Sequence, residues 1–110
     1  MVMTSDTLIE EINVAYGRLS AAMEDLARAD RGLSEHVKRV RLDNAEAILE
    51  AKNERTARLY LDGLLDTEEH RHLENERATA ELDLQRARHE VERLHLIVRL
   101  LGTHAGEGIH

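Results

Sequence analysis

The chain has 110 residues and contains no cysteine, proline, tryptophan or phenylalanine. Without cysteine it can form no disulfide framework, no thiolate metal site and no cysteine nucleophile. Its only aromatic residues apart from histidine are Tyr16 and Tyr60, which is unlike the composition of β-rich folds. The remaining sequence is rich in Ala, Leu, Glu and Arg, the residues typical of long helices and coiled coils. We therefore expect an all-α fold.

Long hydrophobic runs are also missing. No stretch approaches the ~18 consecutive apolar residues that a membrane-spanning helix needs, and the first residues do not resemble a secretory signal. We expect a cytoplasmic protein without a membrane partner. Because a helical chain of this length buries only a modest core by itself, we also expect a homo-oligomer, most simply a dimer.

Charge of one sign dominates, since the net charge is −7. Residues 1–27 carry five acids and one base, and residues 59–110 carry eleven acids and six bases. Only residues 28–58, with six acids and eight bases, are basic. Sequence-independent DNA binding usually needs a clear basic footprint, so the charge gives only weak support for such binding.

Glycines divide the chain into three predicted helices, over residues 5–31, 34–61 and 67–101. Gly32 predicts a kink or a short turn. Gly63 predicts the end of a helix and the turn of an antiparallel hairpin. These helices would form one domain, residues 1–101, with coiled-coil-like packing and a flexible tail over residues 102–110.

Two finer boundaries follow from capping residues. Asp66 or Thr67 is expected to cap the last helix, whose first turn is acidic. Asp43 and Glu46 have the spacing of a capping box, which predicts a stutter or a fresh helix start near residue 43.

Heptad patterns predict the interfaces. In residues 5–31, one seven-residue ladder starts at Ile9 and another at Ile12, and we assign them to positions a and d of a coiled coil. The last helix keeps one heptad frame to Leu101, and its final two turns are apolar nearly all round, so they need cover on more than one side. The predicted oligomer or partner interface consists of Ile9, Ile12, Tyr16, Leu19, Met23, Leu26, Leu84, Val91, Leu94, Val98 and Leu101.

Three polar residues interrupt this seam at a positions, namely Asp30, His70 and Arg77. Polar residues at a can fix the register of a coiled coil at some cost in stability. The alternative is that the two helices are splayed apart at these three positions, near a turn. The heptad pattern does not distinguish between these two interpretations.

Two Glu-x-x-His pairs, Glu69/His72 and Glu92/His95, have the spacing found in di-metal helical bundles. The heptad frame places both pairs off the inner seam, so we predict no metal site and no cofactor. The sequence also lacks a phosphate-binding glycine loop, a nucleophile elbow and a zinc-protease motif. We therefore expect no enzymatic activity and no catalytic residues.

Basic residues near the middle of the chain are the candidate contacts for nucleic acid or an acidic partner: Lys38, Arg39, Arg41, Lys52, Arg55 and Arg58. The competing interpretation is intrachain ion pairing with Glu35, Glu50 and Glu54 on a solvated helix.

The segment of residues 44–59, followed by a Gly/Asp turn and a long helix, resembles small all-helical coiled-coil proteins encoded by tailed phages and prophages. The resemblance covers residues 40–101. It includes an Asn-Glu-x-x-Arg-like element, here Asn53, Glu54 and Arg55 with Arg58, before a helical hairpin. The resemblance implies a role that accompanies phage DNA replication or recombination in the host cytoplasm. It assigns no catalytic or binding residue.

Two hypotheses follow. The first is a non-enzymatic, oligomeric helical accessory protein that engages a protein partner or DNA during nucleic-acid transactions. The alternative is a structural or assembly protein, a scaffold or adaptor, that acts only through coiled-coil association.

Overall fold

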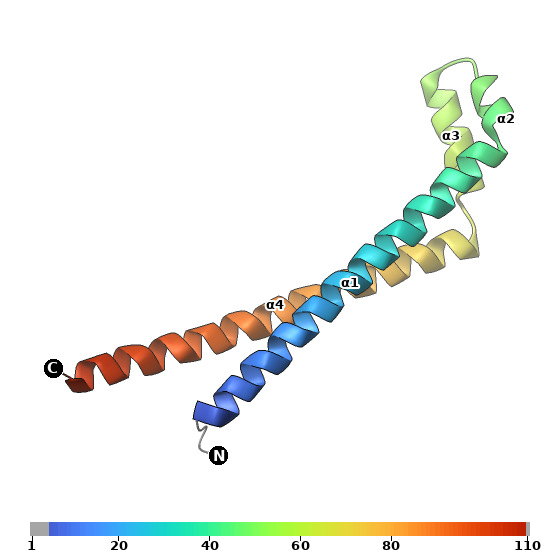
Figure 1. The fold of residues 1–110 in the computed structure, drawn as a ribbon. Coiled ribbons are helices and arrows are strands. Elements are labelled where there is room, and N and C mark those ends of the chain that lie inside the picture. Colours follow the sequence, from blue (N-terminus) through green and yellow to red (C-terminus); the bar gives the residue numbers. More distant parts are fainter. Residues whose placement is uncertain (1–4, 110) are drawn as a thin grey trace. The chain divides into compact units, whose positions relative to one another are not determined.

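The computed structural model describes residues 5–109, with side chains as far as residue 102. Its helices are α1 (Ser5–Asp43), α2 (Ala45–Leu49), α3 (Glu54–Leu64) and α4 (Glu68–Ile109), as Figure 1 shows. No strand occurs in this range. The predicted all-α fold, with long helices joined by a hairpin, is confirmed.

Helix α1 passes through Gly32 without interruption, so the short turn that was one of the two predictions there is wrong. Neither Gly17 nor Gly32 takes a positive φ, and each has the open surroundings of an ordinary exposed helix position. A glycine inside a helix costs about 1 kcal/mol relative to alanine. The apolar pattern keeps its register across this position, from Leu26 to Leu33, and its packing outweighs that cost.

The second predicted helix, 34–61, is in fact the end of α1 together with α2 and α3. A fresh helix does start near Asp43, as predicted, but Asn44 rather than Asp43 precedes it and makes no side-chain capping bond. Instead, the Asn44 side-chain amide donates to the Val40 carbonyl at 2.9 Å. It thereby satisfies one of the carbonyls left free at the end of α1.

Helix α3 starts at a well-formed cap. Asn53 has an extended backbone, and its side-chain oxygen accepts a hydrogen bond of 2.8 Å from the Thr56 amide. At the other end α3 continues one residue past Gly63, and its last cap residue, Leu65, has a right-handed conformation. The prediction that Gly63 ends the helix is therefore wrong, because no left-handed residue is used in this turn.

Helix α4 begins as predicted. Thr67 Oγ1 accepts a hydrogen bond of 3.1 Å from the His70 amide, and Glu68 and Glu69 occupy the first turn. The helix continues through Gly102 to Ile109, eight residues beyond its predicted end. His110, the last residue of the predicted tail, lies outside the described residues.

The chain forms two compact units. The first unit comprises Met1–Asp25 and Glu81–His110, and the second comprises Leu26–Ala80. In the first unit α1 runs antiparallel to α4, because Tyr16 contacts His95 while Ala22 lies near Asp83 (Figure 1).

In the second unit α1 and α4 are again antiparallel, since Asp30 contacts Arg77 and His36 contacts Glu69. Helices α2 and α3 pack against each other in this unit. Over the described part of the chain, none of the helices is both long and apolar enough to span a membrane.

Candidate functional site

The buried seam of the first unit differs by one residue from the predicted register. Its core contains Leu8, Ala15, Val91 and Leu94, and Ile12, Leu19 and Ile97 pack against them. The ladder through Ile12 and Leu19 was predicted. The ladder that accompanies it starts at Leu8 and continues through Ala15 and Ala22, not at Ile9.

This shift leaves a row of apolar side chains, spaced by seven residues, on the surface of α1. Ile9, Tyr16 and Met23 are 57%, 45% and 53% exposed, and we call them the outer ladder. Alanines at positions 15 and 22 let α1 approach α4 closely, whereas the larger side chains of the outer ladder lie on the flank of the seam. The outer ladder is thus apolar surface that the described chain does not bury.

Helix α4 follows its predicted frame as far as Leu94. Leu84, Val91 and Leu94 are buried, and Leu94 is only 1% exposed. Beyond this point Val98 and Leu101 are exposed, although they occupy seam positions. The exposed apolar residues at this end of α4, which we call the apolar end, are Leu96, Val98, Leu100 and Leu101.

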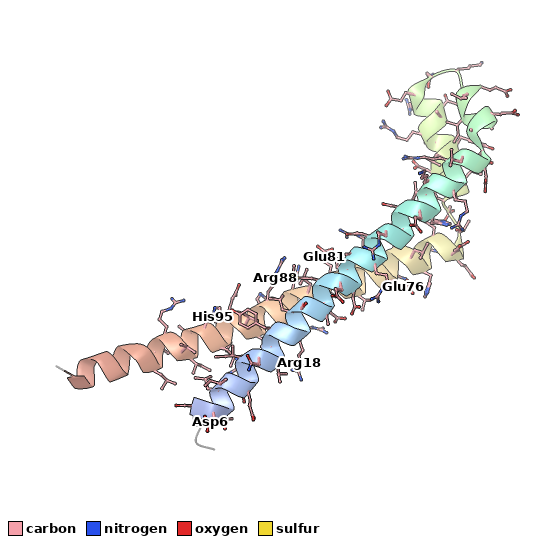
Figure 2. The ribbon with its side chains drawn as sticks, in the orientation of Figure 1. Asp6, Arg18, Glu76, Glu81, Arg88 and His95 are labelled. Carbon is pink, nitrogen blue, oxygen red and sulfur yellow. The ribbon has the colours of Figure 1, made fainter. Side chains whose placement is uncertain are left out.

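A hydrogen bond links the outer ladder to α4. The Tyr16 hydroxyl lies 2.6 Å from His95 Nε2, and the two ring centroids are 5.7 Å apart. His95, labelled in Figure 2, belongs to one of the two Glu-x-x-His pairs, and its partner in that pair, Glu92, is exposed. In the structure, His95 is therefore the hydrogen-bond partner of Tyr16.

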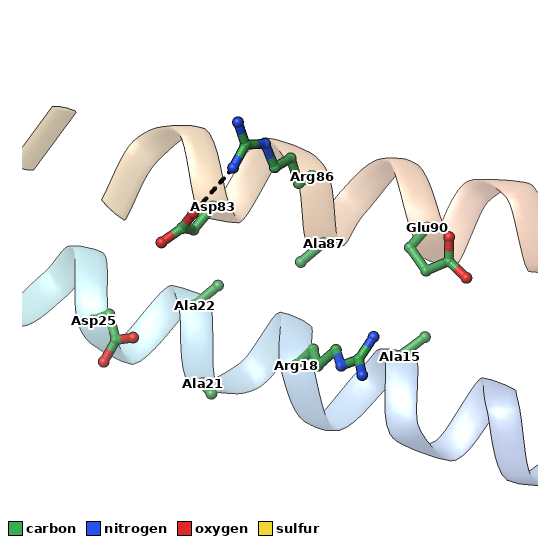
Figure 3. Close-up of a pocket in the computed structure, with 9 residues that line it drawn as sticks. All are labelled: Ala15, Arg18, Ala21, Ala22, Asp25, Asp83, Arg86, Ala87 and Glu90. Carbon is green, nitrogen blue, oxygen red and sulfur yellow. Dashed lines mark ion pairs between the residues drawn. The ribbon is translucent and has the colours of Figure 1, made fainter. Parts of the chain in front are cut away.

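Between α1 and α4 in the first unit lies a groove lined by small side chains, shown in Figure 3. Four alanines line it, namely Ala15, Ala21, Ala22 and Ala87. Charged side chains line its rim, namely Arg18, Asp25, Asp83, Arg86 and Glu90. Asp83 and Arg86 approach each other to 3.7 Å, so this rim consists partly of mutually paired charges.

Glu90 is bound by a neighbouring arginine. Arg93 donates two hydrogen bonds, of 2.8 and 3.1 Å, to the Glu90 carboxylate. These bonds, together with the positive charges of Arg93 and Arg18, lower the pKa of Glu90, and desolvation of the carboxylate opposes them. The same hydrogen bonds raise the pKa of Arg93. Glu90, on the rim of the groove, is therefore paired with Arg93 one turn further along α4.

In the second unit, two of the three polar seam residues contact each other. Arg77 Nε donates to a carboxylate oxygen of Asp30 across the two helices. The contact favours the register-fixing interpretation of these residues over splayed layers.

The third polar seam residue, His70, faces a residue that the sequence interpretation missed. The rings of His36 and His70 lie with their centroids 5.5 Å apart, and His36 is only 7% exposed. In the sequence, His36 stands beside the basic residues around Lys38, and the predicted heptad frame leaves it off the seam. Counting by sevens from Leu8 places it on the seam, after Ala15, Ala22 and Ala29.

The six basic candidates are all exposed in the second unit. Lys38, Arg39 and Arg41 lie in the last turns of α1, Lys52 lies between α2 and α3, and Arg55 and Arg58 lie on α3. Arg58 pairs with Glu54 at 2.8 Å, as the intrachain interpretation requires. The other five have no ion pair or hydrogen bond through their side chains within the described part of the chain.

The Asn-Glu-x-x-Arg-like element has a local structural role. Asn53 caps α3, and Glu54 and Arg58 form the pair one turn apart that stabilises its first turn. Among the described residues, no group of three or more histidine or carboxylate side chains is arranged to hold a metal ion. No protein family, no curated protein and no solved structure matches this chain.

Proposed function

We propose that this chain is a non-enzymatic helical accessory protein whose activity is association, and that it forms a dimer through its outer ladder. The observation that carries the proposal is the exposure of Ile9, Tyr16 and Met23, which recur at the heptad spacing of a helix interface. A helix with apolar residues at two seam positions and a flanking position normally contacts more than one neighbour.

A second copy of the chain is the simplest neighbour for this surface. A two-fold interface brings the same patch of both subunits together, so a ladder with a seven-residue repeat can pack against its own equivalent. The small core of the first unit supports the same proposal, because burying further apolar surface would stabilise it. The apolar end of α4 supplies additional surface for such an assembly.

Light scattering tests the proposal directly. We expect the wild-type chain to have at least twice its mass of 12.5 kDa, and the variant Ile9→Glu/Met23→Glu to have the monomer mass. Both residues are more than half exposed, so circular dichroism should show unchanged helix content in the variant. Leu49→Glu on α2, which replaces a residue 83% exposed, is the matched control and should leave the mass unchanged. A monomeric wild type at high micromolar concentration would refute the dimer.

A second candidate function is contact with nucleic acid, as expected of an accessory protein in phage DNA replication or recombination in the host cytoplasm. Its support is the set of unpaired basic side chains, of which Lys38 and Arg41 share one face of α1 beside Val37. The resemblance to phage-encoded helical proteins points in the same direction. The overall charge of −7 opposes tight binding.

Fluorescence anisotropy with duplex DNA at low salt tests this candidate. Each phosphate contact adds about 0.9 to the slope of log affinity against log salt, so Lys38→Ala/Arg39→Ala/Arg41→Ala should reduce that slope by about 3. Arg58→Ala, which removes a basic residue already paired with Glu54, should reduce it much less. Absence of binding at micromolar protein would leave association as the only proposed activity.

A further inference from the structure

The histidine pair of the second unit has an unusual arrangement of ring nitrogens. His36 Nε2 and His70 Nδ1 are both buried and have no hydrogen-bond partner among the residues that the structure describes. Buried polar atoms in folded proteins nearly always have partners, since an unsatisfied one costs about 1–3 kcal/mol. The two atoms belong to facing rings on α1 and α4.

The other nitrogen of each ring lies near a carboxylate. Glu74 Oε1 is 3.2 Å from His70 Nε2, and Glu69 Oε1 is 3.7 Å from His36 Nδ1. A carboxylate at the outer nitrogen favours the tautomer whose proton points toward it. The inner nitrogens, His36 Nε2 and His70 Nδ1, then both present lone pairs and no proton.

We propose that His36 Nε2 and His70 Nδ1 bind a divalent transition-metal ion of the zinc type. Neutral imidazole is a preferred ligand of such ions, and metal-binding histidines usually donate their second nitrogen to a carboxylate. Two imidazoles on one tetrahedral zinc ion, with nitrogens 2.0–2.1 Å from the metal, have ring centroids roughly 5–5.5 Å apart. The observed 5.5 Å is compatible with that geometry.

The site has two protein ligands, so water completes the coordination. The His70 side chain is 14% exposed, which gives water access, whereas the His36 side chain is 9% exposed. Because one ligand comes from each helix, the metal would clamp α1 to α4 within the second unit. Binding to the folded state alone would raise its stability by mass action.

Zinc titration of chelator-treated protein tests the site. We expect Zn²⁺ at about a hundred times its Kd to raise the Tm by roughly 12 °C, and Mg²⁺, which prefers oxygen ligands, to have no effect. His36→Gln and His70→Gln should each abolish the shift. His72→Gln should retain it, because His72 makes a similar contact of 2.9 Å with Glu76 on the same helix but is 71% exposed.

A second measurement does not depend on how the variants fold. In wild-type protein, the NMR ring signals of His36 and His70 should shift at lower Zn²⁺ concentrations than those of the other five histidines. Exposed histidines whose signals shift at the lowest zinc concentrations, or an equal Tm shift in His36→Gln, would overturn the proposal. So would His36 and His70 signals that do not shift with zinc at all. These readouts do not involve the oligomeric state, so they succeed or fail independently of the outer ladder.

Discussion

The Tyr16 hydroxyl and His95 Nε2 lie 2.6 Å apart and join positions separated by 79 residues in the sequence. The bond lies beside the buried seam, where α1 and α4 meet in the first unit. It connects one residue of the outer ladder to α4.

Removal of this bond should have a small effect. Tyr16→Phe keeps the apolar ring and deletes the hydroxyl, so we expect a loss of about 0.5–1.5 kcal/mol in the free energy of unfolding. Tyr60→Phe is the matched control, because Tyr60 is similarly exposed and has no side-chain hydrogen bond in the described chain. Urea denaturation of both variants checks the prediction, and equal losses would show that the bond does not form.

The core of the first unit depends strongly on Leu94. Leu94→Ala removes the least exposed leucine, and we expect a loss of about 2–5 kcal/mol in the free energy of unfolding. Leu82→Ala makes the same change at a position of α4 that is 52% exposed, and should cost less than about 0.5 kcal/mol. Thermal denaturation followed by circular dichroism compares the two. Similar losses in both variants would contradict the assignment of the buried seam.

Gly32 provides a test of the continuity of α1. An added Cβ at this position meets nothing within 4 Å, and its backbone is helical. Gly32→Ala should therefore stabilise the protein by about 0.5–1 kcal/mol. If α1 instead broke at Gly32, the substitution would lower the Tm.

The ion pair between Glu90 and Arg93 should produce a specific pH dependence. Because folding lowers the pKa of Glu90, its stabilising contribution is complete above about pH 4.3, the pKa of an unperturbed glutamate. The contribution is lost as the pH falls through the lower folded-state pKa.

Carboxyl NMR titration measures this pKa. Arg93→Gln should bring the Glu90 pKa back toward its ordinary value, because it removes the hydrogen bonds and one nearby positive charge. Arg99→Gln, which removes an exposed charge from the same helix, should leave it lowered. A Glu90 pKa that is the same in wild type and Arg93→Gln would exclude the pair.

The sequence predicted α4 better than α1, for a physical reason. In α4 the buried residues Leu84, Val91 and Leu94 are separated mainly by charged residues, so only one apolar stripe is available. In α1 the ladders from Leu8 and Ile9 are adjacent and both apolar, and periodicity alone cannot select between them. The close approach that Ala15 permits decides the choice, and it depends on the opposite helix.

The histidine pair shows the same limit. His70 was recognised as a polar seam residue because the α4 frame was right. His36 was missed because the α1 frame was displaced by one residue. The turn near Gly63 was located correctly. However, α3 ends at a cap residue with a right-handed conformation, Leu65, and α4 starts at a cap formed by the Thr67 side chain. Gly63 therefore does not mark the helix end.

Because the chain has no cysteine, single cysteine substitutions can test the central claim. The claim is that the outer ladder forms the contact between two chains, whereas the buried seam packs within one chain. The measurement is the rate of thiol labelling of Met23→Cys, Ala22→Cys and Leu82→Cys at low and high protein concentration. We predict slow labelling of Ala22→Cys throughout, fast labelling of Leu82→Cys throughout, and labelling of Met23→Cys that slows as the concentration rises. Fast labelling of Met23→Cys at every concentration would contradict the claim.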